Sequence, residues 1–543
     1  MVDAKAKRLT LIACILGTVV VFVDGTIVNV ALPKIRSDLD VGLSAQQWII
    51  DAYLLTLGSL LLVGGSLGDL YGRRRMFRLG VIGFGITSLL CAAAPTATLL
   101  IVARGLQGVT GALLVPATLG IITATFSDAE RGKAIGTWTA WSGISTVIGP
   151  LAGGLILENV SWRFIFGVNI VPILITLYLI RHMSAVHDRP REGSVDAVGG
   201  VLCALGLGGA VFALIEQPNY SWGDPIIWGP LIGGVALLVA FLLWERRARD
   251  PMLSLDLFRR RNFSVGNAST LLVYGGLGGS TFLLPIFLQE VAGYTPLEAG
   301  TALLPVTIIM FLLSSRFGAL ADRFGPRWFM GLGPIVAAIG LLLFTRLGAD
   351  VNYVTDVLPA AAIFGLGLTM TVAPLTATVL GGVDEEHASL ASGINNAIAR
   401  VAGLVAIAFV GAVVSAQFGS SLDSNVKAFA QAPGVPAAVD QAKDRALAAE
   451  APASVGPRRA QLRAALTDAS VDGFAAGTLV MAILVAAGGV ISAIGIVNPE
   501  REVKCAECPG GALAGATQDA GRADSLRDRP LPRVKVPQPA AEA

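Results

Sequence analysis

Charged residues are scarce in this sequence. Only 14% of its 543 residues are Asp, Glu, Lys or Arg, whereas a soluble globular chain carries about 25%. Hydrophobic residues make up 54%, and the net charge of +2 is not gathered into a basic patch with aromatic residues. The composition therefore predicts an integral membrane protein and argues against nucleic acid as a partner.

Residues that catalyse reactions or bind metals are scarce as well. The chain has three histidines and no zinc-protease, nucleophile-elbow or nucleotide-binding motif. Cys14, Cys91 and Cys203 fall within apolar stretches, as small hydrophobic residues do. Cys505 and Cys508 form a C-A-E-C without a second pair or a histidine nearby, which favours an incidental spacing over a zinc or redox site. We expect no catalytic residue, no metal, no cofactor and no enzyme activity.

Long apolar stretches dominate the chain instead. Stretches of about 20 apolar residues are long enough to cross a bilayer as helices. They occur at 9–31, 46–68, 77–95, 98–124, 134–157, 164–181, 196–215, 226–244, 265–288, 299–317, 328–346, 355–381, 391–416 and 474–496. The first is too long for the core of a signal peptide, so we expect it to be retained. The sequence predicts an all-α membrane protein with 14 transmembrane helices.

Lys and Arg in the short loops predict the orientation. Basic residues concentrate in alternate loops, for example at 73–78 and 246–261, while the loops between them hold few. Because basic loops remain inside, both termini are expected in the cytoplasm and the protein in the cell membrane.

One short motif occurs twice and suggests an internal duplication. The stretches GSLGDLYGRRR, from Gly65 to Arg75, and GALADRFGPR, from Gly318 to Arg327, share the pattern G-x-L-x-D-x-x-G-x-R, with Asp69 aligned on Asp322. Eight predicted helices separate the copies, whereas a simple six-plus-six duplication would separate them by six. The domains predicted from this offset are a six-helix half at 1–181, a linker with two inserted helices at 182–264, a second half at 265–497 that includes a long outside loop at 417–473, and a disordered tail at 498–543.

The repeated motif is a candidate gate. Asp69 ends the second helix, Gly72 permits a tight turn, and Arg73 lies four residues from Asp69, within reach of an ion pair. Such a latch could hold the cytoplasmic side closed, although charged loops also serve simply to anchor topology. The candidate gate residues are Gly65, Asp69, Gly72, Arg73, Arg74, Asp322, Arg323, Gly325 and Arg327.

Asp24 and Arg104 are candidates for proton coupling. Charges inside membrane spans are costly and default to transport pathways. Asp24 lies about seven residues from the outer end of the first helix and Arg104 about six from that of the fourth, which is roughly 10 Å and 9 Å. At matched depths Arg104 can control how readily Asp24 releases a proton. The alternative is a static ion pair that fixes helix packing.

The fifth helix carries a glycine-rich motif. Gly149 and Gly153 form a small-x-x-x-small contact and Pro150 bends the helix, so a neighbouring helix can approach closely and rock. Ordinary close packing would use the same glycines, which with Gly143 and Gly154 complete the motif.

Candidate cavity residues are Asn29, Gln107, Asn395 and Arg400, with Asn396 beside them. Asp51, Glu216 and Glu290 are expected near outer helix ends as solvated charges.

At these residues the chain resembles the 14-helix drug:proton antiporters (EmrB/QacA-like) of the major facilitator superfamily. GSLGDLYGRRR resembles the cytoplasmic loop motif, RGLQGVTGA the fourth-helix motif whose arginine the family implicates in proton coupling, GISTVIGPLAGG the antiporter motif, and VDGTIVNVALP the first-helix motif. Leu70 replaces the basic residue usual after Asp69, whereas the second copy keeps Arg323.

This resemblance implies a monomeric, alternating-access exporter that exchanges protons for small organic compounds, amphipathic or cationic. It needs no cofactor because the proton gradient drives it. The helix 5 motif disfavours the alternative of a proton-coupled importer. A non-transporting membrane sensor or scaffold is the other alternative, and the intramembrane charges argue against it.

Overall fold

The computed structural model describes residues 4–183, 194–220, 223–381 and 388–498, and its regular elements are helices. The first nine are α1 (Ala4–Leu39), α2 (Leu43–Tyr71), α3 (Arg73–Ala93), α4 (Ala97–Thr125), α5 (Asp128–Asn159), α6 (Phe164–Gly167), α7 (Ile170–His182), α8 (Ala197–Glu216) and α9 (Pro225–Glu245). The others are α10 (Arg261–Glu290), α11 (Pro296–Thr301), α12 (Leu304–Phe324), α13 (Pro326–Phe344), α14 (Leu358–Gly381), α15 (Ala388–Val426), α16 (Val435–Asp444) and α17 (Arg459–Gly495).

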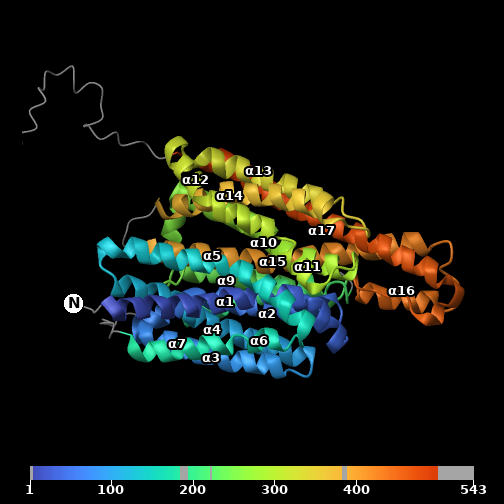
Figure 1. Cartoon of the computed structure of the whole chain (residues 1–543), viewed down its shortest axis with the longest axis horizontal. Coiled ribbons are helices and arrows are strands. Elements are labelled where there is room, and N and C mark those ends of the chain that lie inside the picture. The colour runs from blue at the N-terminus through green and yellow to red at the C-terminus, as the bar shows by residue number, and fades with distance from the viewer. Residues whose placement is uncertain (1–3, 184–193, 221–222, 382–387, 499–543) are drawn as a thin grey trace, which may run out of the picture. The chain divides into compact units, whose positions relative to one another are not determined.

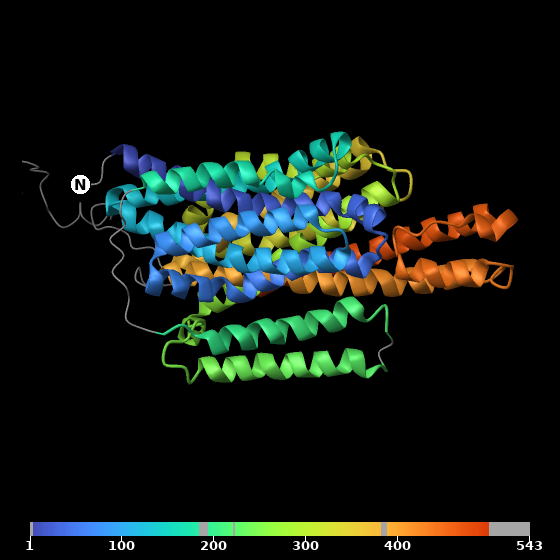
Figure 2. The same cartoon turned by 90° about the horizontal axis from the view of Figure 1, so that it is seen from below.

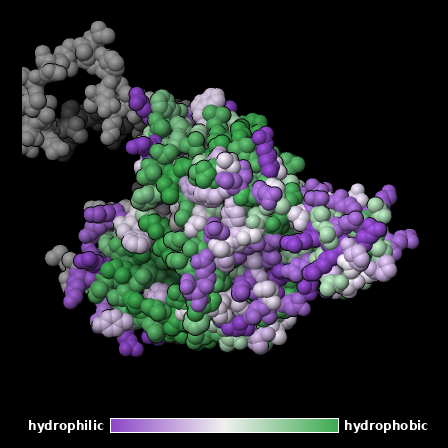
Figure 3. Space-filling model, turned by 45° about the vertical axis from the view of Figure 1, so that its right-hand side comes forward, coloured by the Kyte–Doolittle hydropathy of each residue, from purple (hydrophilic) through white to green (hydrophobic). Residues whose placement is uncertain are grey.

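Fourteen segments of the described chain are long and apolar enough to cross a membrane. This confirms the fold class and the helix number predicted from the sequence. Two spans are interrupted, because α6 and α7 together form the sixth and α11 and α12 the tenth. In Figure 3 hydrophobic residues cover broad areas at the top and left of the centre, and hydrophilic residues gather at the left-hand edge and toward the projection on the right. Exposed leucines and isoleucines of this kind suit contact with lipid tails rather than water.

The helices run side by side along one direction (Figure 1), and α8 and α9 lie together at one edge (Figure 2). Packing repeats at an offset of eight spans: α3 contacts α4 as α13 contacts α14, and α1 contacts α5 as α10 contacts α15. The pair α8 and α9 has no counterpart in this repeat, and α8 packs on α2 and α15. A duplicated six-helix unit with two inserted helices predicts this pattern.

The repeated motif is helical rather than a loop, which differs from the expectation. Asp69 lies in the last turn of α2 and Asp322 in that of α12, and one glycine alone separates each helix from the next. Gly72 has φ 96° and ψ 122°, and Gly325 has φ 89° and ψ 145°. Residues with a Cβ are strained at such positive φ values, so the motif needs glycine there.

The segment 417–473 is also more helical than the expected loop. Helix α15 continues to Val426 and α17 begins at Arg459, so both extend past the predicted spans, with α16 between them. These parts project beyond the other helices in Figure 2, along the helix direction rather than across it. The helices α16 and α17 are not continuous, and Gly456 adopts a positive φ of 61° between them. Val435, Val439 and Leu462 are buried there, which explains why the segment folds. The predicted tail, from residue 499 on, lies outside the described residues.

Candidate functional site

The structure brings Asp24 and Arg104 together. Asp24 of α1 is 0% exposed and Arg104 of α4 is 1% exposed, and Arg104 Nη1 donates a hydrogen bond to Asp24 Oδ2. The ion pair that matched depths predicted is therefore present and sealed from solvent. Breaking a buried pair by removing one partner costs about 3–5 kcal/mol, because the other charge is left uncompensated.

Polar side chains from three further positions complete this site. Gln107 Nε2 donates to Asp24 Oδ1 (3.0 Å) and to Ser88 Oγ (2.9 Å), while its Oε1 accepts from Arg104 Nη1 (2.7 Å). Asn169 Nδ2 donates to Asp24 Oδ1 at 2.8 Å. The carboxylate thus receives donors from Arg104, Gln107 and Asn169. We call these five residues, Asp24, Ser88, Arg104, Gln107 and Asn169, the carboxylate network.

Two of these residues were missed by the sequence analysis. Asn169 lies between α6 and α7, and Ser88 lies on α3. The signal for Asn169 was its place as a polar residue within an apolar stretch, FGVNIVPIL. Ser88 carried no such signal, because serine is common in helices that pack closely.

The remaining contacts of Arg104 hold its guanidinium in place. Its Nε donates to the backbone carbonyl of Ile49 on α2 (3.1 Å). Its Cζ lies 4.2 Å from the centre of the Tyr53 ring and 5.8 Å from that of Phe166. Desolvated cation–π contacts of this kind add to the stability of the buried cation. The carboxylate network is thus built from α1, α3, α4 and the α6–α7 junction, and α2 supports Arg104; all of these lie within residues 1–181.

The two copies of the repeated motif share one contact, in which an arginine bonds to the end of a neighbouring helix. Arg73 Nε donates to Asp69 Oδ1 (3.0 Å) and its Nη1 to the carbonyl of Gly120 on α4 (2.9 Å). Arg74 donates to the carbonyl of Ile180 on α7 (2.6 Å), and the aligned Arg327 to that of Ala493 on α17 (2.6 Å).

Other gate candidates contribute packing. Arg323 lies with its Cζ 5.3 Å from the ring centre of Phe324. Gly65 faces the ring of Pro116, 3.6 Å from the position its Cβ would take. No hydrogen bond or ion pair of Asp322 is resolved among the described residues. Through the hydrogen bonds of Arg73 and Arg74, the first copy ties α2 and α3 to α4 and α7.

The glycines of α5 contact two different neighbours. A Cβ added at Gly149 would lie 2.0 Å from the Thr26 hydroxyl of α1, and one at Gly153 would lie 2.9 Å from Ile27. One at Gly154 would lie 2.6 Å from the Cα of Leu297 on α11. The carbonyl of Pro150 lies 2.5 Å from the Cβ position of Gly300, also on α11. The motif therefore joins the first predicted half to the second.

Gly143 differs from these glycines. A Cβ added there would meet open space. No neighbour packs closely enough at Gly143 to require glycine there, although the sequence analysis included Gly143 in the motif.

The four candidate cavity residues do not form one cluster. Gln107 belongs to the carboxylate network, and Asn29 is buried on α1 with Oδ1 unpartnered. Asn395 Nδ2 donates to Thr270 Oγ1 (2.8 Å) and to Asn267 Oδ1 (3.0 Å) of α10. Arg400 reaches across to α1, with its Cζ 4.5 Å from the ring centre of Phe22. Of the four, Arg400 contacts a helix of the other predicted half.

The acidic residues expected as solvated charges are better protected than predicted. Asp51 is 0% exposed, and neither carboxylate oxygen has a hydrogen-bond partner. Glu290 accepts two hydrogen bonds from Arg36, at 3.0 and 3.1 Å, and Glu216 accepts one from Trp48 Nε1 at 2.8 Å. The expectation of a solvated Asp51 was wrong, because α15 covers this face of α2: Gln47, one turn away, donates to the carbonyl of Ile407 on α15 at 2.8 Å.

Comparison with known proteins places this geometry in a family context. A family model described as "Major Facilitator Superfamily" matches residues 14–407. The chain is 37% identical to puromycin resistance protein pur8 of Streptomyces alboniger, over 74% of this chain and 81% of that protein. It is 32% identical to multidrug resistance protein Stp of Mycobacterium tuberculosis, over 78% and 79% of the two chains. It is 33% identical to the tetracenomycin C resistance and export protein of Streptomyces glaucescens, over 76% of each.

Solved structures share the fold at lower sequence identity. A bacterial homologue of the human lysosomal transporter Spinster, in an inward-facing and unoccupied conformation, superposes with a TM-score of 0.63 at 15% identity, covering 90% of this chain and 98% of the other. The peptide transporter POT, in complex with sulfate, gives a TM-score of 0.56 at 14% identity, with 74% and 88% covered. These likenesses concern the fold alone.

Proposed function

The chain belongs to the Major Facilitator Superfamily and is a membrane transporter rather than an enzyme; from this premise we propose that it is a proton-coupled antiporter that exports small organic compounds by alternating access. Asp24 is the proton-binding group and Arg104 its partner. One observation carries the proposal: a carboxylate sealed within a membrane protein and held by a cation and two amides. Such a group in a span marks a proton pathway by default.

The chemistry of the site supports an exchange of one proton at Asp24. When the carboxylate accepts a proton, it loses its charge-assisted bond with Arg104, and the carboxylate network must rearrange. Release of the proton restores the pair. Two arrangements of the network therefore correspond to the protonated and deprotonated transporter, and each can favour one orientation of the helices.

Helix α1 offers a contiguous route from this site to the contact between the predicted halves. Asp24 lies two residues from Thr26, whose hydroxyl packs against Gly149 of α5. Helix α5 in turn contacts α11 through Pro150 and Gly154. A shift of α1 on protonation would therefore reach α11 through packed neighbours, as coupling between two states requires.

The substrate proposal draws on the relatives. Their names refer to puromycin, to tetracenomycin C and to multiple drugs. We propose small organic compounds, amphipathic or cationic, as the exported class. We also propose that the protein works as a monomer in the cell membrane with both termini in the cytoplasm, because basic residues concentrate in the loops on that side.

Substitution of Asp24 tests the mechanism. In vesicles with an acidic lumen that hold the purified chain and a pH-sensitive dye, external puromycin or ethidium should drive protons out of the lumen. The proton efflux should in turn move the compound into the lumen against its gradient. Asp24→Asn should abolish both movements, because an amide cannot bind and release the proton. The control Asp423→Asn makes the same change in an exposed ion pair with Lys443 and should leave both unchanged.

Transport that continues at full rate with the proton gradient collapsed would overturn proton coupling. Undiminished proton release by Asp24→Asn would remove Asp24 from the mechanism. Uptake driven by the inward proton gradient, in the direction opposite to export, would identify an importer instead.

A further inference from the structure

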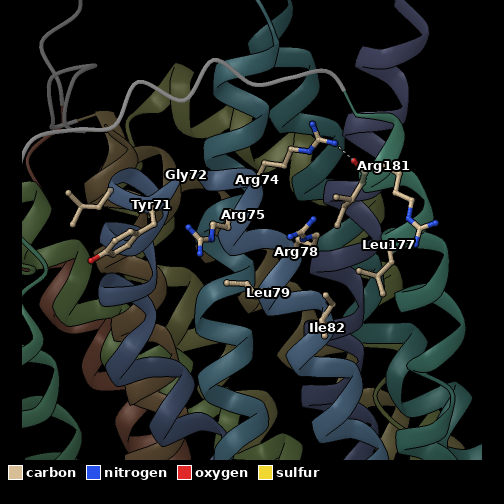
Figure 4. A pocket seen from close by; sticks show the side chains of 11 residues that line it. Tyr71, Gly72, Arg74, Arg75, Arg78, Leu79, Ile82, Leu177 and Arg181 are labelled. Carbon is tan, nitrogen blue, oxygen red and sulfur yellow. Dashed lines mark hydrogen bonds between the residues drawn. The ribbon is translucent and has the colours of Figure 1, made fainter.

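A groove between α3 and α7 collects four arginines. It has a volume of about 950 Å³ and lies at the end of the bundle predicted to be cytoplasmic. Arg74, Arg75 and Arg78 line it from the first turns of α3, and Arg181 lines it from the end of α7. Figure 4 shows their guanidinium groups spread across the mouth of the groove. None of the described residues that line it is Asp or Glu.

Most of this charge is available to a ligand. Arg74 donates to the carbonyl of Ile180 (2.6 Å), which ties it to the wall of the groove. Arg75, Arg78 and Arg181 are exposed. Like charges gathered without a carboxylate repel one another, so a ligand with negative charge would stabilise the cluster. Guanidinium groups bind phosphate oxygens with two parallel hydrogen bonds, which favours a phosphate ester over a monovalent inorganic anion.

The floor of the groove is apolar. Leu79 and Ile82 of α3 and Leu177 of α7 lie deeper along the helices than the arginines (Figure 4). Leu79 is 43% exposed and Ile82 is 39% exposed. Four-residue steps place Arg75 above Leu79 on α3, and Arg78 above Ile82. The groove thus presents cations at the interface and hydrocarbon toward the membrane interior.

The second half of the chain provides an internal comparison. When Asp69 is aligned on Asp322, Arg75 corresponds to Trp328 and Arg78 to Gly331. The equivalent bonds of Arg74 and Arg327, to Ile180 and Ala493, place Ile494 opposite Arg181. The second half keeps the tethering arginine but not the other three. The fold therefore does not require this cluster.

We propose that the groove between α3 and α7 is a binding site for an anionic phospholipid, whose phosphate sits among Arg75, Arg78 and Arg181 and whose acyl chain lies along Leu79 and Ile82. Basic pockets between helices at a membrane interface suit such headgroups. The apolar floor distinguishes a lipid from a free phosphate ester, which would have no use for it. The site lies on the periphery of the helix bundle and is separate from the carboxylate network.

Lipid binding to the full, delipidated chain in detergent tests the proposal. Phosphatidylglycerol, cardiolipin and phosphatidylcholine are titrated separately, and bound lipid is counted by native mass spectrometry. The two anionic lipids should bind at least about tenfold more tightly than phosphatidylcholine. The triple change Arg75→Gln, Arg78→Gln and Arg181→Gln should weaken anionic lipid binding on the order of a hundredfold, since each basic residue near the surface contributes about 1 kcal/mol.

A matched control removes the same number of charges at the same predicted side of the membrane. Arg246, Arg247 and Arg249, which follow α9, are exposed, and their change to glutamine should leave lipid binding unchanged. The lysine variant of Arg75, Arg78 and Arg181 keeps the charge and should retain the preference for anionic lipids, which keeps the test valid if the glutamine variant does not fold.

Three results would overturn the proposal. One is equal binding of phosphatidylcholine and phosphatidylglycerol. Another is equal loss of lipid binding in the control triple variant. The third is displacement of the lipid by inorganic phosphate or by glycerophosphoglycerol at matched concentration, which would identify an anion site without a role for the acyl chain.

Discussion

Asn169 is one of two amides that hold the buried carboxylate of Asp24. Its Nδ2 lies 2.8 Å from Asp24 Oδ1 and 3.3 Å from Ser88 Oγ, and the side chain is 2% exposed. Gln107 donates to the same carboxylate oxygen, so neither amide acts alone. Each residue of the carboxylate network is therefore held by at least two others.

Substitution of Asn169 should disturb both stability and coupling. Asn169→Ala removes a donor to a buried charge, and we expect about 1–3 kcal/mol of lost stability. The pH at which transport is half-maximal should also move, because hydrogen bonding to the charged form is one of the determinants of proton affinity. Thermal unfolding in detergent and transport measured against pH check the two effects.

Asn159 offers the matched control. Its amide donates to the carbonyl of Leu155, at 2.8 Å, in the exposed end of α5. Asn159→Ala should change neither the pH profile nor the stability appreciably. An unchanged pH profile in Asn169→Ala would restrict this residue to a packing role.

At the scale of the element, α5 shows that glycines of one motif differ in how closely a neighbouring helix packs on them. Gly149 and Gly153 face α1, and Gly154 faces α11, at distances that leave no room for a methyl group. Gly143 lies in the same helix with open space around its Cβ position. A glycine motif in the sequence predicts that neighbouring helices pack closely. Whether a given position requires glycine depends on which helix faces it.

The pair Gly149→Ala and Gly143→Ala separates these roles. The first should cost about 1–3 kcal/mol by overpacking against Thr26 and reduce transport, because α5 can no longer approach α1. The second should be neutral or slightly stabilising, since alanine favours a helix. Unfolding temperature and transport rate of the two purified variants check this. Equal behaviour of the two variants would contradict the packing assignment.

At the scale of the whole bundle, the predicted halves are joined at the end that carries α16. Arg36 of α1 pairs with Glu290 of α10, and both are mostly buried, with 11% and 14% of their side chains exposed. Gln289 Nε2 donates to the carbonyl of Val30 (3.0 Å), and Arg445 pairs with Asp40 (2.7 Å). This is the end predicted to face outside. The conformation is closed there.

Loss of the Arg36–Glu290 pair should favour opening of this end. Arg36→Gln removes two charge-assisted bonds that exist only when the halves meet, and a loss of about 1–3 kcal/mol shifts the population of the open state at least about fivefold. Thr98 and Asp350 are both exposed. Spin labels at these two positions would report the opening as a longer label-to-label distance in double electron–electron resonance spectroscopy.

Arg163→Gln is the control for this shift. Arg163 pairs with Asp38 at the same end, at 2.7 Å, but both partners belong to the first predicted half. Its loss should leave the label distances as they are. Identical distances in Arg36→Gln and the parent protein would mean that the pair does not contribute to closure.

The sequence by itself determined the class of protein, the number of spans and the pairing of Asp24 with Arg104. Apolar length is a local property, and so is the depth of a residue along a helix, so both can be counted from the chain. The family relationship followed from the same local motifs. The repeated motif predicted the offset of eight spans that the packing shows.

Only the tertiary structure decided which polar residues surround that pair and which charges are sealed. Asn169 reaches Asp24 because the α6–α7 junction packs against α1, and Ser88 of α3 holds the amides of Asn169 and Gln107. Asp51 is buried because α15 covers α2. The arginine groove likewise exists because α7 ends beside the start of α3. Contacts between helices distant in the chain depend on how the whole bundle packs, and a periodic apolar pattern does not encode which neighbour a given face will meet.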